Sequence, residues 1–293
     1  MNKLTDILQC DRPVICGAMG MLSGPGLVSA VSEAGGFGVL ATAFATDPDL
    51  VRDMIRQTRK RTKKPFGLNL QVMNPLCEQF LTIAAEEGVA AVTVSGGNPA
   101  RLMENRPPIP FLVVTGTVRA AKKAAALGAD AVIVEGAESG GIQGMKTAAT
   151  MALAPAVADA VDTPIVAAGG IADHRGFLAA MELGACGVQM GTRFIATEEC
   201  PAHESYKQAI LTAGPEDTLL LCAGSFAVRT LPTPLTQAVQ QGQDVDLDKL
   251  AGPALENAWL HGADPGVLPA GQGCGIINEI LPAAEVVRLV AGA

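Results

Sequence analysis

The sequence predicts a (βα)8 barrel, and three observations lead to that fold. Apolar runs that begin with proline alternate strictly with apolar runs that follow a glycine at the end of a helix. Most of these runs are apolar at every position, which is typical of parallel strands covered on both faces. The 293 residues are also enough for one barrel of about 250 residues with a small additional region. An open doubly wound sheet is the alternative architecture.

Each set of runs has its own local signal. A proline fits the first residue of a strand, where its missing N–H does little harm. A glycine fits the end of a helix, where the chain adopts the left-handed conformation before entering the next strand. The prolines are Pro13, Pro65, Pro110 and Pro164, and the glycines are Gly35, Gly88, Gly128 and Gly184. The eight strands are expected near 14–17, 38–41, 66–70, 91–95, 111–114, 131–134, 165–168 and 187–190.

Helices are expected between these strands, and the pattern changes after the eighth. We expect residues 1–199 to form the barrel, 200–266 a small, mainly helical cap, and 267–293 a segment that returns to the barrel. An apolar run, Leu219–Cys222, interrupts the cap. The expected barrel helices include 29–34, 48–61, 118–127, 151–161 and 175–183; two or three helices are expected in the cap, around 203–212, 234–241 and 246–260, and the last helix is 279–290.

Composition excludes several classes of function. The net charge is −8, and a basic cluster at residues 56–64 fits the last turns of a helix better than a nucleic-acid patch. No apolar run reaches the ~18 residues of a membrane helix, and the first twelve residues lack a signal-peptide core. We therefore expect a cytoplasmic location, with no membrane or nucleic-acid partner. The seven cysteines include no CxxC pair, so neither a disulfide framework nor a metal site is expected.

Glycine turns follow the seventh and eighth predicted strands. In (βα)8 barrels a phosphate site commonly forms from these two loops, because exposed amides there can surround an anion. The residues are Gly169 and Gly170 in the first turn, and Gly191 and Thr192 in the second. Glycine serving only tight geometry is the alternative, but two such turns on neighbouring strands favour a phosphate-bearing ligand.

Small or neutral polar residues follow most of the other strands. Such a rim suits a large planar ring that is contacted by main-chain and amide groups, and a flavin fits that description. The rim residues are Gly17, Ala18, Met19, Asn69, Gln71, 95–98, Thr115, Thr117 and 135–141.

Eight short stretches, in order over nearly the whole chain, form a recognisable set: Pro13-Val-Ile-Cys-Gly-Ala-Met, 29–38, 65–70, Glu135-Gly-Ala-Glu-Ser-Gly-Gly, 167–173, Gly191-Thr-Arg-Phe, 202–207 and Ala270-Gly-Gln-Gly-Cys-Gly. Through these stretches the chain resembles the nitronate monooxygenase (2-nitropropane dioxygenase) family, and equally the flavoprotein enoyl-acyl-carrier-protein reductases.

The resemblance implies an FMN across the barrel mouth. By position, Gly17, Ala18 and Met19 would back the ring, and Asn69 and Gln71 would meet its polar edge. Gln272 would close the site. Glu135 would reach the ribityl chain, with Ser139, Gly140 and Gly141 beside it, and Gly169, Gly170, Gly191 and Thr192 would bind the phosphate.

One position departs from both families. They usually carry histidine after the paired glycines of the sixth-strand loop, and this chain has Ile142 there. An isoleucine cannot take the proton from a nitroalkane carbon, so no catalytic residue is assigned. His174 is the nearest alternative, although an N-terminal helix position suits it better. His203 and His261 are interpreted as packing and surface residues, and Tyr206 and Cys16 remain only by elimination.

The function expected from these observations is an FMN-dependent oxidoreductase of nitronate monooxygenase type. It would oxidise nitronates, or pass electrons from NAD(P)H through FMN to a small organic acceptor. Alternatives are a flavin-dependent enoyl reductase, an NAD(P)H:quinone reductase, and a flavin-binding protein without catalysis. An inosine-monophosphate dehydrogenase type is disfavoured because residues 136–150 contain no cysteine. A homodimer is compatible with the sequence.

Overall fold

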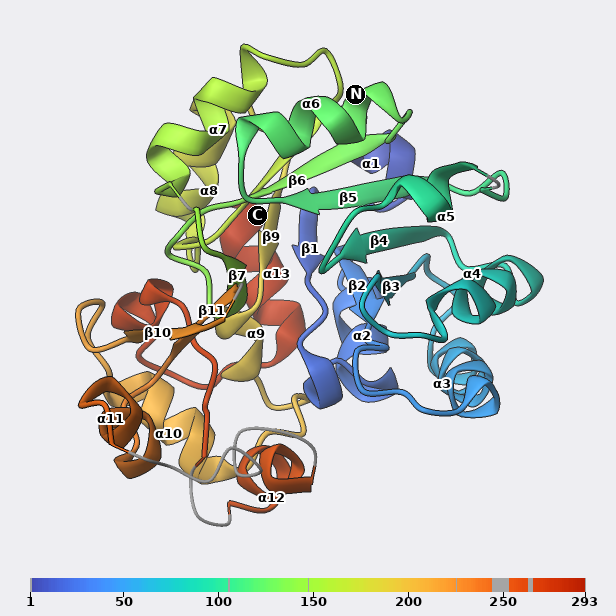
Figure 1. The fold of residues 1–293 in the computed structure, drawn as a ribbon. Helices are drawn as coiled ribbons and strands as arrows, with labels where there is room; N and C mark the ends of the chain where they lie inside the picture. Colours follow the sequence, from blue (N-terminus) through green and yellow to red (C-terminus); the bar gives the residue numbers. More distant parts are fainter. Residues whose placement is uncertain are drawn as a thin grey trace.

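The computed structural model describes residues 2–104, 106–146, 148–224, 226–243, 253–262 and 266–292. Eight parallel strands close into a barrel, with β1 paired to both β2 and β9 (Figure 1). The predicted (βα)8 barrel is therefore confirmed. Its strands are β1 Val14–Cys16, β2 Phe37–Leu40, β3 Gly67–Gln71, β4 Ala91–Ser95, β5 Phe111–Thr115, β6 Ala131–Glu135, β8 Ile165–Ala168 and β9 Val188–Met190.

Helices surround the barrel, and their ends carry the expected local signals. Asp47, Thr117 and Asp173 each cap a helix by accepting a hydrogen bond from a main-chain amide of the first turn. Gly128, at φ +85°, links a helix to the next strand as predicted. The helices are α2 Pro25–Glu33, α3 Pro48–Arg61, α4 Cys77–Glu86, α5 Ala100–Glu104, α6 Val118–Ala126, α7 Thr150–Ala158, α8 His174–Glu182, α9 Thr192–Ile195 and α13 Ala283–Ala291.

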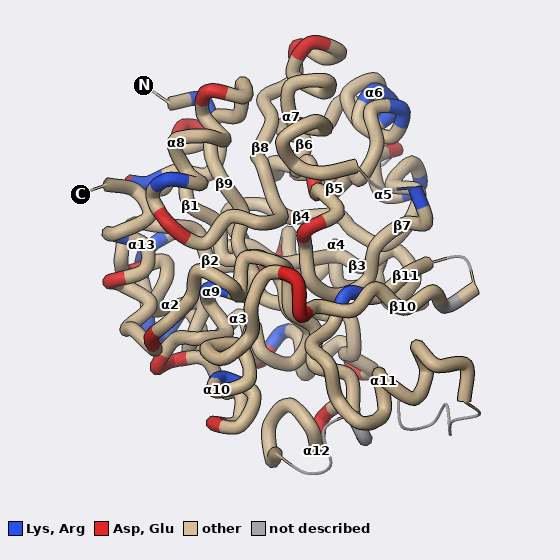
Figure 2. Tube along the Cα trace, turned by 90° about the vertical axis from the view of Figure 1, so that its left-hand side faces the viewer, with Lys and Arg blue, Asp and Glu red and all other residues tan. Residues whose placement is uncertain are grey.

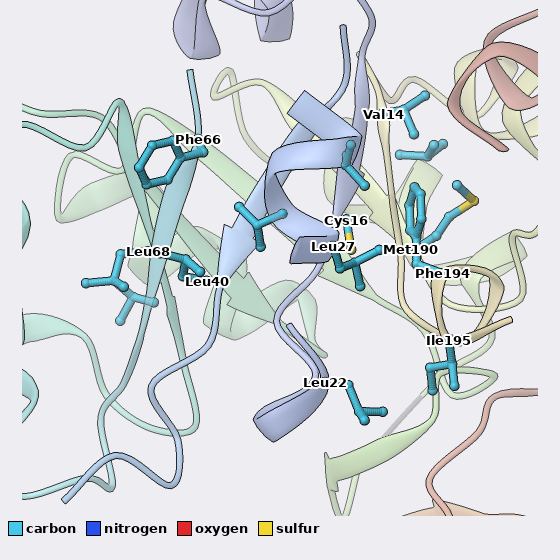
Figure 3. Packing of buried hydrophobic residues seen from close by; sticks show 14 of the residues in the cluster. Val14, Cys16, Leu22, Leu27, Leu40, Phe66, Leu68, Met190, Phe194 and Ile195 are labelled. Carbon is cyan, nitrogen blue, oxygen red and sulfur yellow. The ribbon is translucent and has the colours of Figure 1, made fainter. Parts of the chain in front are cut away.

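The strands bury apolar side chains on both faces. On β1, Ile15 belongs to the cluster inside the barrel. Val14 and Cys16 belong to the other cluster, which packs against the helices (Figure 3). A helix that the sequence analysis did not predict, α1 (Lys3–Leu8), adds Leu4 and Leu8 to the inner cluster. Helix α1 therefore extends the inner cluster. In this fold, ligands bind at the loops that follow the carboxyl ends of the strands.

A sheet that was not predicted joins the region after β9 to the segment that follows β6. Strands β7 (Gly141–Gly144), β11 (Phe226–Thr230) and β10 (Leu219–Ala223) form an antiparallel sheet in the order β10-β11-β7. The expectation of a mainly helical cap was therefore incomplete, because β7 and β11 lie far apart in sequence and no local pattern reveals their pairing. The helical elements here are α10 Glu204–Thr212, α11 Pro234–Gln240, α12 Pro253–His261 and the 3₁₀ helix η3 Gln272–Ile276.

Some expectations concern residues only partly covered by the structure. The helix expected at 246–260 corresponds to α12 in its second half, and positions 246–252 lie outside the described residues. None of the described helices has the length and apolar character needed to span a membrane. All seven cysteines are free thiols, of which Cys222 is exposed.

Candidate active site at the barrel mouth

Two glycine turns lie side by side at the carboxyl ends of β8 and β9. The two strands are paired, with Ala168 opposite Gln189, so the turns that follow them are neighbours. Gly169 and Gly170 have φ values of +99° and +75°, which L-residues with side chains rarely adopt. The sequence prediction that these turns form one site is therefore compatible with the fold.

The amides of these turns lack protein partners. Across the described part of the chain, no group accepts a hydrogen bond from the N–H of Gly170, Ile171, Gly191 or Thr192. Main-chain amides are obligatory donors, and a set of them pointing to one place is a common anion-binding arrangement. The start of α8 contributes less than expected, because the Asp173 side chain accepts from the Gly176 N–H.

The loop after β6 is tied to the first glycine turn. The Thr150 hydroxyl donates to the carbonyl oxygens of Ala168 and Gly169, at 3.2 and 2.9 Å. Both oxygens of the Glu138 carboxylate accept from the Thr150 N–H, the nearer at 2.8 Å, so this charge faces the positive end of α7. The sequence predicts Glu138 on the rim without a role and gives no signal for Thr150, because their contact depends on loop geometry.

The returning C-terminal segment crosses both turns. Gln272 N–H donates to the Glu138 carbonyl at 2.9 Å, and Gly271 N–H donates to the Thr192 hydroxyl at 2.9 Å. The crossing is close, since a Cβ at Gly140 would lie 2.6 Å from the Ala270 carbonyl carbon. Gln272 therefore lies at the barrel mouth.

The loop after β1 meets the β9 turn from the other side. The Met19 sulfur lies 3.5 Å from where a Cβ of Gly191 would be, and a Cβ at Gly17 would lie 2.9 Å from the Gln189 side chain, which would have to shift. Gln189 is a mouth residue that sequence analysis missed. Its signal was a single amide between Val188 and Met190 in an otherwise apolar strand.

Asn69 is more enclosed than the sequence analysis expected. It is only 5% exposed, and its Nδ2 donates to the Thr93 hydroxyl at 2.9 Å and the Ser95 hydroxyl at 3.2 Å. Gln71 is half-buried, and its side chain lies against Gly96. Of these two amides, Gln71 is therefore the one with side-chain donors left for a ligand.

Glu135 and Ser139 lie at the end of β6 and in the loop that follows. Burial raises the pKa of Glu135 from 4.5 to about 7, while the neighbouring Ser139 hydroxyl partly opposes that rise. The Ser139 oxygen is buried near the Glu135 carboxyl but forms no hydrogen bond of ordinary geometry within the described structure. A buried hydroxyl in that state is a point where a ligand can bind.

Ile142 lies in β7 opposite Val228, and its side chain is 48% exposed. The three histidines have other places in the fold, and His261 is exposed at the end of α12. The His174 ring bonds the Val290 carbonyl at 2.9 Å and stacks on Phe177, and His203 caps α10.

The residues kept by elimination are also engaged elsewhere. Tyr206 is buried and donates from its hydroxyl to the Pro269 carbonyl at 2.6 Å. Cys16 is buried, and burial raises the pKa of its thiol well above the usual value. Neither group is a free acid or base at neutral pH.

Comparisons with known proteins place this geometry in context. A family model described as nitronate monooxygenase matches residues 1–292. The nitronate monooxygenase of Pseudomonas aeruginosa strain PAO1 is 32% identical, over 98% of this chain and 97% of that protein. FabK from Thermotoga maritima superposes with a TM-score of 0.90 at 35% identity, over 99% of this chain and 94% of that chain.

A third relative is more similar over a shorter stretch. The (3aS,4S,5R,7aS)-5-hydroxy-7a-methyl-1-oxo-octahydro-1H-indene-4-carboxyl-CoA dehydrogenase of Rhodococcus jostii strain RHA1 is 39% identical over 219 residues. That match covers 74% of this chain and 61% of the relative, which is less than two thirds of the relative's length.

Proposed function

The chain belongs to the nitronate monooxygenase family of oxidoreductases, and from that premise we propose that it binds FMN at the barrel mouth. We further propose that it passes electrons between NAD(P)H and a small organic substrate. The observation that carries the proposal is the group of unpaired amides at Gly170, Ile171, Gly191 and Thr192.

The residues at the mouth fit this cofactor. The free amides suit the terminal phosphate of a mononucleotide, which carries negative charge and several acceptor oxygens. The buried Ser139 hydroxyl, beside Glu135 at the end of β6, suits the polar ribityl chain. Beside the place expected for the ring, Gly17 offers only main-chain atoms and Met19 offers a thioether, so neither residue brings a charge there. When bound, FMN supplies reversible hydride and electron transfer.

The protein's own residues would position the cofactor. Thr150 holds the carbonyl oxygens of the first glycine turn, so the amides of Gly170 and Ile171 stay turned to the ligand. Gln272 is fixed over the mouth through its main-chain bond to Glu138, where it would limit access of water. Gln71 keeps its side-chain amide available for the polar edge of the ring.

Ile142 narrows the reaction class. Ile142 occupies the position at which the resemblance implies a histidine base, so we favour substrates that need no proton abstraction from a neutral nitroalkane. These are enoyl thioesters, quinones, and nitronates that are already ionised. The 39% identical Rhodococcus relative is named for a CoA thioester, which supports a thioester as the substrate of this chain.

Anaerobic reduction tests the proposal. The purified protein should carry a yellow cofactor that bleaches on addition of NADH or NADPH. Separate additions of an enoyl-CoA, a quinone, or a nitronate with oxygen should then identify the acceptor that restores the colour. A yellow protein that no donor bleaches would instead support a flavin-binding protein without catalysis.

A further inference from the structure

A groove of about 620 Å³ lies beyond the carboxyl ends of β4 and β5. It is lined by the loop that begins at Gly97, by the last residues of β5, and by the first half of α6. Gly96, at the edge of this loop, contacts the side chain of Gln71. The groove therefore opens at the same end of the barrel as the proposed cofactor site and next to it.

Three cations surround the groove. Arg119 and Lys123 come from α6, and Lys146 comes from the segment that follows β7. None of the three forms an ion pair with any carboxylate among the described residues. Figure 2 shows this basic character along α6.

The position of Arg119 on its helix is electrostatically unfavourable without an anion nearby. It lies in the first turn of α6, where the helix dipole is positive and disfavours a cation. The stretch from Gly116 to Gly128 contains no acidic residue that would offset this repulsion. An anion in the groove would remove this conflict.

The remaining walls suit an aromatic base more than a bare phosphate. Pro99, Val113 and Ala120 give the groove apolar surface. Thr115 also lines it, is 5% exposed, and has a hydroxyl without a partner in the described structure. The volume is also much larger than the ~30 Å³ that one water-sized group occupies.

We propose that this groove binds the phosphorylated ribose and adenine of an adenosine nucleotide. The shared chemistry is a phosphomonoester on the ribose, which is present in both CoA thioesters and NADPH. This inference rests on the proposed function, because either molecule would lay its reactive end over the barrel mouth. Arg119, Lys123 and Lys146 contact the phosphomonoester, and the apolar wall contacts the base.

Calorimetric titration of the purified protein tests this site without turnover. The probes are adenosine 3′,5′-bisphosphate, adenosine 2′,5′-bisphosphate and AMP, which lacks the second phosphate. We expect at least one bisphosphate to bind roughly tenfold or more tightly than AMP, as charge-assisted hydrogen bonds imply. Preference for the 3′,5′ isomer assigns the site to a CoA thioester, and preference for the 2′,5′ isomer assigns it to NADPH.

Charge reversal locates the site. Arg119→Glu and Lys123→Glu should each weaken binding of the preferred bisphosphate by roughly tenfold to a hundredfold. Lys122→Glu is the matched control, because Lys122 is an exposed cation on the same helix but does not line the groove. It should change binding by less than about twofold.

The proposal is overturned if AMP binds as tightly as both bisphosphates, if neither bisphosphate binds, or if Lys122→Glu weakens binding as much as Arg119→Glu. These outcomes are separate from failure of the proposed function. A protein without bound or reducible flavin would still give a readable bisphosphate titration.

Discussion

At the scale of one residue, Ile142 leaves the barrel mouth without a side chain at that position that could remove a proton. Its side chain is half-exposed and apolar, and the imidazoles of His174 and His203 are engaged elsewhere. A base at residue 142 would speed removal of a carbon-bound proton, whereas hydride transfer to an activated acceptor does not require one. The sequence alone revealed this substitution, but not the neighbouring strand pairing that fixes where the side chain lies.

Ile142→His tests the role of this position. The variant should raise turnover of a neutral nitroalkane at least about tenfold, because a positioned general base typically contributes 10²–10⁴-fold. Turnover of a preformed nitronate should change little. Ile142→Asn is the control, since it adds polarity without a base near neutral pH. An equal gain in both variants, or no gain in either, would show that a base at this position is not the missing element.

Glu135 makes stability depend on pH. Its raised pKa means that the folded flavin-free protein favours the protonated carboxyl. The contribution of protonated Glu135 to the free energy of unfolding is fully present below about pH 4.5, and it is lost as the pH rises through about 7.

Glu135→Gln should therefore stabilise the flavin-free protein relative to wild type at pH 8 by about 1–3 kcal/mol, and by much less at pH 4.5. Thermal or urea unfolding across this pH range measures the difference. Glu104→Gln, at an exposed carboxylate on α5, serves as the control. A pH-independent difference between Glu135→Gln and wild type would refute the assigned pKa.

Among the elements, the two glycine turns depend on what packs behind them. Thr150 and Glu138 hold the first turn, and the segment at Gly271 holds the second through Thr192. The turns were predictable because glycines follow two neighbouring strands. Their supports were not, since they join residues from three distant parts of the chain.

Gly170→Val should abolish retention of the cofactor. A side chain is strained at φ +75°, and its Cβ would lie 3.3 Å from the Glu138 Cβ, so the turn would shift its amides. Gly128→Val is the matched control, because Gly128 has φ +85° and open space around it. Absorbance of the purified variants compares their flavin content. Loss of flavin in both variants would indicate general instability, and retention in Gly170→Val would place the phosphate elsewhere.

The small sheet marks the limit of local sequence patterns. All eight barrel strands were predicted within a few residues, because proline and glycine signals recur with each unit. Strand β7 has the sequence Gly-Ile-Gln-Gly, which carries no strand signal of its own. It forms a strand because it pairs with β11, which lies far away in the sequence.

Over the whole molecule, the packing that stabilises the barrel and the groups proposed to bind ligands lie at opposite ends of the strands. Helix α1 packs Leu4 and Leu8 against the apolar interior, while the loops at the other ends of the strands carry unpaired amides and hydroxyls. The same barrel can therefore carry different loop residues at its mouth. For this reason the fold was predictable from the sequence, whereas the substrate was not.

The most direct test of the account is the identity and amount of cofactor bound by the purified chain, measured by absorption spectrum and mass spectrometry after denaturation. We expect FMN at close to one molecule per chain. A chain that binds no flavin, even after incubation with excess FMN, would contradict the proposal that the two glycine turns hold the phosphate of this cofactor.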